Sequence, residues 1–579
     1  MSNKTKTGYP SIDKPQNNGA SFFSTHPIIP NINIYTLLKL TSIKHRNAPA
    51  VDCLELKATY AQLLQDAVTV STALKELGVK KGEVAAVSMP NLYQALVIFF
   101  ACNRIGVITT FLDAQASADE ILSYLNLFDC PIFFNYDREA DYNQKIADGS
   151  KVSCIVTLNQ KAINTVGFSF SAPKTSGKFI SYENLGVIAG RRKNKFEPMH
   201  GKKEDALILF TSGSTGKPKS VLLTNENVLA AEIYAMNTSH TQNITSPKTM
   251  ICVPFSYPYG FVTSALTSLL WGKESILAPN ISKDTISYYY TKNPGIVFGS
   301  PALLDLTINY IPAQQKLTST THFISGGDFL TVQHAQKGTD FFMQHGADNV
   351  EIGNGFGNAE TVSIGSTPVG VPLRQETAGK ILVGTNVMIV NPDTMEELTY
   401  GKEGLLLVSG KHVFKEYYKD PELTREVKTV INGREYYNTG TMGFIDEDGY
   451  FTVTGRQSRF YIMSSLNKVY CDNVQNIISI YDGVQDCAVV KVPDKELLFV
   501  NKAYIVLDAD FAPTAETEQR IRAMLNYSVL APTGRNVQLK PYEMPAYIEF
   551  VSSLPRKPGT EKINYQFLEQ DAAQKHGES

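Results

Sequence analysis

The stretch Leu209–Lys219 has the sequence LFTSGSTGKPK and carries the most information about this chain. It continues the apolar run 206–210, which predicts a buried strand. Glycines let backbone N–H groups approach an anion closely, Ser and Thr add hydroxyl donors, and Lys217 and Lys219 add positive charge. The stretch therefore predicts a strand followed by a phosphate-binding loop. Gly213 and Gly216 are too close together for a Walker A loop.

Length and composition limit the possible functions. The chain has 579 residues, too many for one hydrophobic core, which predicts two or more domains. Its 54 Lys and Arg nearly balance 56 Asp and Glu, so we expect no nucleic-acid partner. Seven cysteines without C-x-x-C spacing favour reduced thiols in a cytoplasmic protein. The apolar segment 92–112 contains Asn103 and Arg104, so it predicts a core helix and a strand and no membrane span.

Strand-like and helix-like patterns alternate along much of the chain. Residues 1–30 are rich in Asn, Ser, Pro and Lys and predict a disordered tail. A helical pattern from Thr59 to Leu74 and a strand-like run at 84–88 open a series that predicts parallel α/β layers. The less periodic segment 145–201 is expected to loop over the surface.

The motif T-S-G-S-T-G-x-P-K resembles the phosphate loop of the adenylate-forming superfamily, which includes acyl-CoA synthetases, adenylation domains of peptide synthetases and luciferases. The resemblance runs from about Tyr35 to about Phe567. It implies an α/β fold whose large N-terminal part, residues 31–455, has layered α/β sheets and a small β-barrel-like portion. A small α+β C-terminal domain, residues 456–570, would be a mobile lid, and residues 571–579 a tail.

Two further motifs resemble the adenine side of the superfamily's nucleotide site. The segment 325–330, S-G-G-D-F-L, resembles the turn whose backbone flanks the adenine. The segment 353–361, G-N-G-F-G-N-A-E-T, resembles G-Y-G-x-T-E, so Phe356 would stack on adenine and Glu360 would hold Mg²⁺. An apolar ring suits a purine face and a carboxylate suits a hard cation. Ala359 replaces the usual Thr, so one hydroxyl near the α-phosphate is missing.

The ribose motif is altered. The segment 437–443, Y-N-T-G-T-M-G, has Thr441 where the superfamily has an aspartate that grips both ribose hydroxyls. Losing that acceptor costs roughly 1.5–3 kcal/mol, or roughly ten- to a hundred-fold in affinity. The resemblance implies that the nucleotide-binding residues are Thr211, Ser212, Gly213, Ser214, Thr215, Gly216, Lys217, Gly327, Asp328, Gly355, Phe356, Gly357, Asn358, Glu360, Thr441, Arg456 and Lys562. It implies that Glu360 and Thr215 bind the metal.

The hinge and the C-terminal lysine motif follow. After Gly455-Arg456 the chain departs from G-R-x-x-D-x-I-K-x-x-G, with Arg459 at the usual hinge Asp or Lys and no tunnel-lining glycine. Asn473 and Gln475 replace two expected glutamates. The segment 554–563, L-P-R-K-P-G-T-E-K-I, resembles L-P-R-T-x-x-G-K-I, which makes Lys562 the expected catalytic lysine. Glu360 and Thr211 complete the expected catalytic set.

The implied reaction has two steps. A carboxylate attacks the α-phosphate of ATP and expels pyrophosphate, and then a thiol of CoA, or of phosphopantetheine on an acyl carrier protein, takes the acyl group. The pocket motif 254–260, P-F-S-Y-P-Y-G, lacks the Phe-Asp pair of amino-acid-activating relatives and suits a fatty or aromatic acid. The expected substrate-binding residues are Tyr257, Tyr259, Gly260 and Gly353.

Three functions stay open at this point. An acyl-CoA synthetase is the leading interpretation. An acyl-AMP ligase that loads a carrier protein is favoured by the altered hinge. A non-catalytic homologue that binds nucleotide or acyl ligand is favoured by Thr441 and Ala359. The phosphate loop together with Glu360, Arg456 and Lys562 argues against a non-catalytic protein, because such a protein has no chemical need for this combination.

Overall fold

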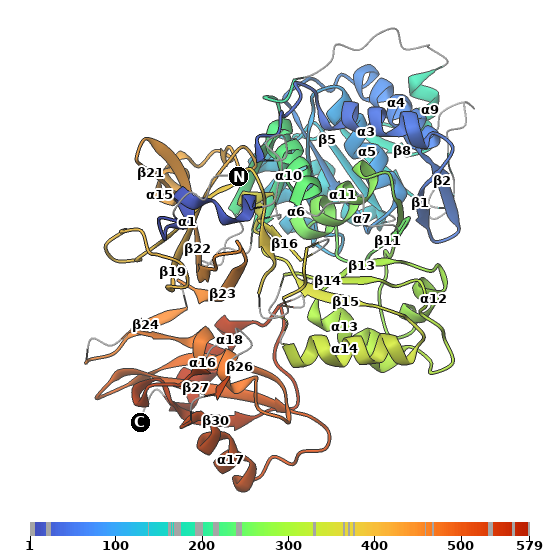
Figure 1. Cartoon of the computed structure of the whole chain (residues 1–579). Coiled ribbons are helices and arrows are strands. Elements are labelled where there is room, and N and C mark those ends of the chain that lie inside the picture. Colours follow the sequence, from blue (N-terminus) through green and yellow to red (C-terminus); the bar gives the residue numbers. More distant parts are fainter. Residues whose placement is uncertain are drawn as a thin grey trace.

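The computed structural model has two large layered sheets, a barrel-like portion and a smaller C-terminal domain (Figure 1). It describes residues 6–18, 25–136, 138–159, 164, 166, 175–190, 201–211, 219–238, 246–327, 330, 332–362, 365–368, 371–374, 377–457, 459–465, 468–527, 529–530, 536–557 and 562–576.

The phosphate-loop stretch belongs to a nine-stranded sheet of order β20-β10-β9-β4-β3-β5-β6-β8-β7. Its strands are β3 (Val84–Ser88), β4 (Ile108–Leu112), β5 (Ile132–Tyr136), β6 (Cys154–Leu158), β7 (Thr175–Ser176), β8 (Phe179–Ser181), β9 (Asp205–Thr211), β10 (Lys219–Thr224) and β20 (Glu416–Tyr417). The strands from β9 to β8 pair in parallel, and β10, β20 and β7 add antiparallel edges. The central strands are continuous apolar runs because both faces of the sheet are covered.

A seven-stranded sheet of order β15-β14-β13-β11-β12-β1-β2 lies beside it. Its strands are β1 (Pro49–Cys53), β2 (Leu56–Thr59), β11 (Lys248–Ile251), β12 (Glu274–Leu277), β13 (Ile296–Gly299), β14 (His322–Ser325) and β15 (Glu351–Asn354). The pairing is parallel except between β1 and β2. The carboxyl ends of β13, β14 and β15 therefore meet at one edge, where ligands bind in open α/β sheets.

Helices between the sheets form the main core. One hydrophobic cluster joins side chains of both sheets to α4 (Tyr60–Glu76), α5 (Tyr93–Arg104) and α10 (Asn225–Thr238). Every residue of α5 is buried, which explains why the segment is apolar all round. Helix α4 begins at a capping box in which Thr59 and Gln62 satisfy each other's backbone N–H groups. The core helix and strand predicted for 92–112 are confirmed as α5 and β4.

The remaining helices cover the outer faces. Side chains of α6 (Ala118–Phe128) and α7 (Ala140–Gly149) pack on the nine-stranded sheet. Those of α12 (Ile286–Thr291), α13 (Pro301–Tyr310) and α14 (Val332–Gln344) pack on the seven-stranded sheet. Other helices are α3 (Ile34–His45), α9 (Asn184–Ala189), η3 (Tyr259–Leu266), α11 (Thr267–Leu270), η4 (Ala359–Thr361) and α15 (Pro421–Val427).

Two sequence expectations need correction. The segment 145–201 contains β6, β8 and α9 and is not only a surface loop, because the run Cys154–Leu158 is short but buried in the sheet. Residues 6–18 of the expected tail carry α1 (Pro10–Asp13) and η1 (Pro15–Asn17). Gln16 is buried and donates from Nε2 to the carbonyl of Thr385 at 2.8 Å, so tertiary contacts order this polar segment.

The barrel-like portion is antiparallel. It contains β18 (Asn386–Val390), β19 (Gly404–Ser409), β21 (Lys428–Ile431), β22 (Arg434–Ile445) and β23 (Phe451–Arg456), with the pair β16 (Ser366–Thr367) and β17 (Lys380–Ile381) beside it. Alternating apolar residues of β18, β19 and β22 face its small cores.

The C-terminal domain lies below the barrel and α14 in Figure 1. A sheet of β26 (Val484–Asp494), β27 (Leu498–Leu507) and β30 (Pro545–Phe550) packs against α16 (Cys471–Ile478), α17 (Ala515–Leu525) and α18 (Tyr565–His576). Shorter elements are β24 (Phe460–Ile462), β25 (Lys468–Tyr470), β28 (Val529–Leu530), β29 (Asn536–Val537) and η5 (Pro541–Glu543). Helix α18 continues to His576, so residues 571–576 are helical and not a loose tail. The predicted α/β fold with a small α+β second domain is confirmed.

Candidate active site

A tight turn after β14 receives the end of the C-terminal domain. Ser325 ends β14 and is fully buried, and the N–H of Gly326 donates to the carbonyl of Gly299 at 3.0 Å. Gly327 has a φ of +86°, a conformation that residues with side chains rarely adopt. Lys562 Cε lies 3.8 Å from the point where a Cβ would stand on Gly327. The structure therefore brings the expected catalytic lysine to the turn predicted to flank adenine.

The strands on either side of the phosphate loop hold its two ends together. β9 and β10 pair antiparallel, and Thr211 stands opposite Lys219. The loop is thus the connection of a hairpin whose first strand continues into the parallel core of the sheet. The predicted loop residues Ser212, Gly213, Ser214, Thr215, Gly216 and Lys217 lie outside the described residues, as does Asp328.

The predicted metal-binding carboxylate is buried beside this hairpin. Glu360 is 4 % exposed and lies in η4, which packs against β9. Asn358 caps η4 by accepting from the N–H of Thr361 at 3.1 Å. Tyr417 donates its hydroxyl to Glu360 Oε1 at 2.6 Å, and the N–H of Phe414 donates to the Glu360 carbonyl at 2.8 Å. Both the backbone and the side chain of Glu360 are therefore fixed.

Burial dominates the electrostatics around Glu360. Burial raises the pKa of Glu360, and this shift outweighs the opposing effects of the Tyr417 hydrogen bond and the charge of Lys219. The Lys219 Nζ lies 5.4 Å from the ring centre of Tyr417. Within the described residues, no three His, Cys, Asp or Glu side chains are grouped to hold a metal by themselves. One carboxylate is the donor set that Mg²⁺ uses when phosphate oxygens supply further ligands, so Glu360 fits such an ion.

The predicted adenine-stacking residue lies at the junction with the barrel. Phe356 is half-buried, and its ring meets Phe451 of β23 edge to face with 5.2 Å between centroids. Gly355 precedes it and donates its N–H to the Ser325 carbonyl at 3.0 Å, which ties the motif to the turn after β14. Gly357 is exposed. The two predicted adenine motifs are therefore adjacent in the fold.

The predicted ribose residues share one strand pair. Thr441 of β22 stands directly opposite Arg456 of β23 in the antiparallel register. The side chain of Arg456 is exposed, whereas Thr441 is 8 % exposed. The N–H of Thr441 donates to Thr439 Oγ1 at 3.1 Å, which shapes the strand at this point. The geometry places a cation across from the position where the superfamily has a carboxylate.

The predicted pocket motif leads into a π-helix. η3 begins at Tyr259, whose hydroxyl donates to the carbonyl of Ile324 at 2.6 Å. A Cβ on Gly326 would stand 3.0 Å from the Tyr259 ring, and Phe298 meets this ring edge to face at 6.3 Å. π-helical segments are frequent at functional sites because the extra residue re-aims a side chain. Tyr259 thus lies at the base of the turn that Lys562 reaches.

The other predicted substrate residues differ in their surroundings. Tyr257 is half-buried, and burial raises the pKa of its hydroxyl. A Cβ on Gly260 would stand 2.3 Å from the carbonyl oxygens of Val253 and Pro254, so this position requires glycine for packing. Gly353 is also crowded by protein atoms, since a Cβ there would stand 2.7 Å from Pro368 Cβ. The two glycines make room for their protein neighbours.

The structure adds residues that the motifs did not identify. Tyr417 is 57 residues from Glu360 in the sequence and belongs to none of the motifs recognised. Tyr437 belongs to the predicted ribose motif, and its hydroxyl accepts from Asn358 Nδ2 at 3.1 Å. Burial beside Glu360 raises the pKa of both phenols. Only the fold brings β20, β22 and η4 together, so spacing in the sequence could not have found them.

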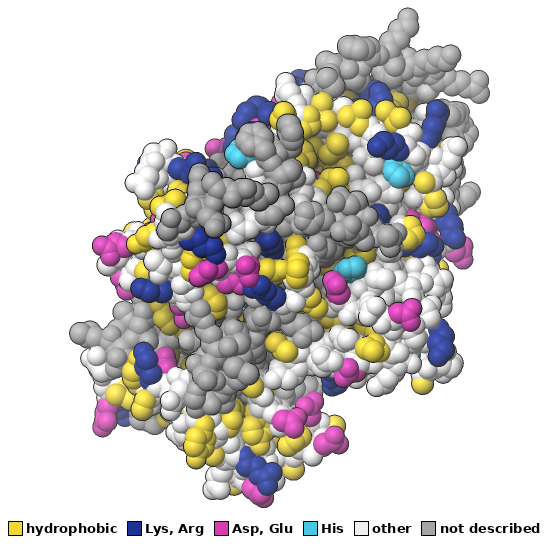
Figure 2. Space-filling model, viewed as in Figure 1, with side chains coloured by type: hydrophobic (Ala, Val, Ile, Leu, Met, Phe, Trp, Pro, Cys, Tyr) yellow, Lys and Arg dark blue, Asp and Glu magenta, His cyan; other side chains and the backbone are white. Residues whose placement is uncertain are grey.

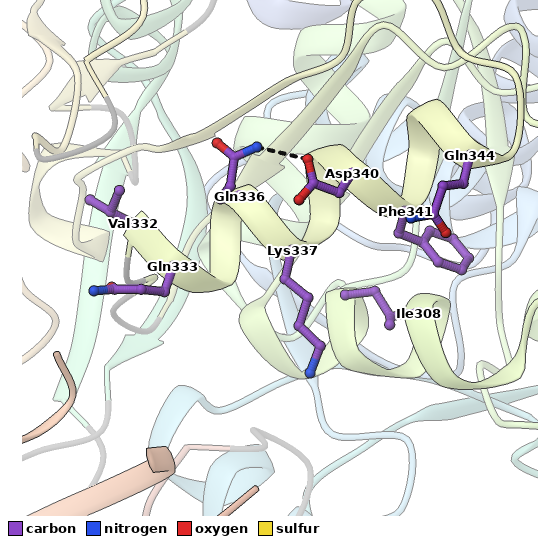
Figure 3. A pocket seen from close by; sticks show the side chains of 8 residues that line it. All are labelled: Ile308, Val332, Gln333, Gln336, Lys337, Asp340, Phe341 and Gln344. Carbon is purple, nitrogen blue, oxygen red and sulfur yellow. Dashed lines mark hydrogen bonds between the residues drawn. The ribbon is translucent and has the colours of Figure 1, made fainter. Parts of the chain in front are cut away.

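A hollow of about 670 Å³ lies elsewhere, between α13 and α14 (Figure 3). It is lined by Ile308, Val332, Gln333, Gln336, Lys337, Asp340, Phe341 and Gln344. Gln336 Nε2 donates to Asp340 Oδ1 at 2.8 Å along the rim. None of the lining residues belongs to the predicted motifs, so this hollow is not the candidate active site.

Figure 2 shows Lys and Arg side chains interspersed with Asp and Glu over the described part of this face. Among the described helices, none combines the length and the apolar character that crossing a membrane requires.

The fold and the site together define a two-domain nucleotide-binding protein of the adenylate-forming superfamily. Residues 41–418 match the AMP-binding enzyme family, and residues 473–560 match the AMP-binding enzyme C-terminal domain. The chain belongs to the AMP-binding enzyme family.

Relatives and solved structures cover nearly the whole chain. A long-chain-fatty-acid–CoA ligase of Bacillus subtilis is 24% identical over 95% of this chain and 96% of its own length. A medium-chain fatty-acid–CoA ligase of Escherichia coli is 26% identical over 86% of this chain and 83% of its own. The structure of the anthranilate CoA ligase AuaEII, in complex with anthranoyl-AMP, has a TM-score of 0.78 at 20% identity and covers 96% of this chain and 100% of its own.

Proposed function

We propose that this protein activates a carboxylic acid with ATP and then transfers the acyl group to the thiol of CoA. The observation that carries the proposal is the position of Lys562, which reaches from the C-terminal domain to the turn at Gly327. The names of the relatives support the reaction class, since those compared above are fatty-acid–CoA ligases and an anthranilate CoA ligase.

Different residues have different roles in the first step, formation of the acyl adenylate. The acid oxygen attacks the α-phosphate in line and pyrophosphate leaves, so negative charge builds up on phosphate oxygens. Lys562 stabilises this charge from the lid, and Thr211 and the phosphate loop that follows it hold the β- and γ-phosphates. Glu360, fixed by Tyr417, together with Thr215 would hold Mg²⁺, which neutralises phosphate charge when it is bound. Phe356 stacks on the adenine.

We further propose a domain boundary at 455/456, one residue before β23 ends at Arg456. The lid, residues 456–570, would turn about this hinge between the two steps. A cytoplasmic location is supported by the seven cysteines, all of which are free thiols and six of which are buried.

The substrate proposed is a fatty or aromatic acid. Ser256 carries no charge to pair with an α-ammonium group, which disfavours amino acids. The Tyr259 and Phe298 rings present an apolar wall below the turn at Gly326. That wall suits a hydrocarbon or ring.

The decisive experiment is ATP–pyrophosphate exchange by the purified chain with separate pools of fatty, aromatic and amino acids. We expect exchange with a fatty or aromatic pool and a loss of roughly 100-fold or more in Lys562→Ala. CoA and a phosphopantetheinylated carrier protein are then offered as acceptors in parallel, and CoA is expected to be used. Absence of exchange with every pool at millimolar ATP would refute the proposed function.

A further inference from the structure

One carboxylate joins the helix α16 of the lid to the last strand of the barrel-like portion. Asp472, the second residue of α16, accepts the backbone N–H of Arg456 on Oδ2 at 2.8 Å and an N–H of the Arg459 guanidinium on Oδ1. Arg456 is the last residue of β23, so its backbone pairs with the barrel-like portion although it is also the first residue of the proposed lid. Gly455 closes the contact from the other side, since a Cβ there would stand 2.8 Å from Asp472 Cβ. Asp472 therefore binds both the start of the hinge and a residue within it.

Arg459 is fixed on its other sides by the C-terminal domain. Its Nη2 donates to the carbonyl of Val489 in β26 at 2.5 Å, and its guanidinium lies 3.5 Å from the ring centre of Tyr565. The side chains of Arg459 and Asp472 are 17 % and 14 % exposed. A charged pair with this little exposure is screened weakly, and its loss leaves an uncompensated charge. Arg459 is thus part of the core of the lid and not a freely exposed hinge residue.

The same contacts continue toward the catalytic lysine. Tyr565, which packs on Arg459, is the first residue of α18 and follows Lys562 by three positions. The N–H of Lys557 donates to the Lys562 carbonyl at 2.8 Å, and so closes the loop that carries the lysine. A second link between the domains is the hydrogen bond from Asn476 Nδ2 to the Thr454 carbonyl at 3.4 Å. The hinge, α16 and the base of the lysine loop therefore form one connected unit.

We propose that Asp472 is a positioning residue that holds the lid in the orientation in which Lys562 reaches the turn at Gly327. The inference rests on the proposed function and assigns this orientation to the adenylation step. A rotation of the lid about residues 456–459 moves α16 away from β23, so the Asp472–Arg456 hydrogen bond must break first. The charge on Asp472 makes that bond stronger than a neutral one.

The hydrogen bond between Arg456 and Asp472 has a second consequence. Its Cα stands opposite Thr441, the predicted ribose position, in the β22–β23 register. Asp472 therefore ties the strand pair of the predicted ribose site to the domain that carries Lys562. Thr441 lacks the charge of the superfamily's aspartate. The Asp472–Arg456 hydrogen bond therefore helps to hold the predicted ribose site and Lys562 in a fixed relative position.

The test separates the two half-reactions in Asp472→Ala. We expect ATP–pyrophosphate exchange to fall about tenfold, the value of one charge-assisted hydrogen bond. Thioester formation from pre-formed acyl adenylate and CoA is expected to stay within about twofold of wild type. Asn476→Ala removes the hydrogen bond to the Thr454 carbonyl without unpairing Arg459, and should lower exchange in the same selective way but less. Glu518→Gln, which breaks the ion pair with Arg522 within α17, is the matched control.

A direct readout of lid orientation uses spin labels on Lys337→Cys in α14 and Gln570→Cys in α18, both exposed positions. Without nucleotide, the wild-type distance distribution is expected to be narrow and to broaden in Asp472→Ala. Equal losses in both half-reactions, no loss in either, or an unchanged distance distribution would overturn the proposal. If the wild type shows no exchange at all, the proposed function fails, while the distance measurement still decides whether Asp472 holds the lid.

Discussion

Lys562 Cε lies in van der Waals contact distance, 3.8 Å, of the site where Gly327 would carry a Cβ. The two residues are 235 positions apart and belong to different domains, so their approach defines the orientation of the lid. Because Gly327 has a φ of +86°, the turn can bring its backbone beside the lysine without a side chain between them.

Gly327→Ala should impair adenylation. The substitution forces alanine into a strained backbone conformation that costs about 1–3 kcal/mol, and it places a methyl group beside Lys562. We expect pyrophosphate exchange to fall about tenfold or more. Gly433→Ala is the control, because Gly433 has a φ of +75° but nothing within 4 Å of its Cβ position. Similar losses of exchange in both variants would show that strain alone is responsible.

Glu360→Gln should raise the Mg²⁺ concentration that the exchange reaction requires. The buried carboxylate is the donor that fits the ion, and an amide oxygen binds a hard cation more weakly.

Tyr417→Phe removes the hydrogen bond that orients Glu360 and should weaken binding of ATP with Mg²⁺ about tenfold. Isothermal titration calorimetry measures the affinity for ATP plus Mg²⁺ and, separately, the affinity for AMP alone. Tyr418→Phe, one residue further on, should leave both affinities unchanged.

Thr441→Asp should tighten nucleotide binding. The new carboxylate would stand across the strand pair from Arg456 and offer ribose a charged acceptor. A gain of roughly ten- to a hundred-fold in AMP affinity is expected from one such hydrogen bond. Thr441→Asn has nearly the same shape without the charge and should gain much less. Unchanged AMP affinity in Thr441→Asp would mean that position 441 does not face the ribose.

Tyr259→Ala should change the choice of acid. Removing the ring that packs below Gly326 opens space at the base of the turn, so kcat/KM should rise for longer or bulkier acids relative to short ones. Tyr259→Phe keeps the ring and loses only the bond to the Ile324 carbonyl, so it should keep the wild-type preference. Competition between two acids of different length, read as the product ratio, measures the shift. An identical ratio in Tyr259→Ala would place the acyl pocket elsewhere.

Glu232 should make stability depend on pH. Its carboxyl is fully buried in α10 and accepts from Thr267 Oγ1 at 3.0 Å, and burial raises its pKa from 4.5 to about 8. Between pH 4.5 and about 8 the folded state therefore holds a proton that the unfolded state releases. The contribution of protonated Glu232 to the free energy of unfolding is complete below pH 4.5 and is lost as pH rises toward 8. The slope is at most about 1.4 kcal/mol per pH unit.

Urea unfolding of the wild type and of Glu232→Gln between pH 5 and pH 8 measures that contribution. Glutamine has nearly the same shape and does not titrate, so the free energy of unfolding should fall less with pH in the variant. Parallel pH profiles of the two proteins would show that Glu232 keeps an ordinary pKa in the folded state.

The sequence by itself determined the elements that depend on local pattern. The apolar segment 92–112 predicts a core helix and a strand because its residues are apolar on all sides. The N-cap at Thr59 marks the start of a helix because capping depends only on residues a few positions apart. The motifs around Glu360 and Lys562 are also recognisable, because each is a short run of neighbouring residues. Polar segments such as residues 6–18 were not, because their order comes from distant partners such as Thr385.

Tertiary structure alone decided which motifs meet. The carboxyl ends of parallel strands lie at one edge, so β14 and β15 place the turn at Gly327 beside Phe356, although 29 residues separate them. The roles of Tyr417 and Asp472 follow from contacts between β20 and η4 and between α16 and β23. Such contacts depend on how sheets, barrel and lid pack in three dimensions, and no spacing along one chain encodes them in a form that can be recognised without the fold.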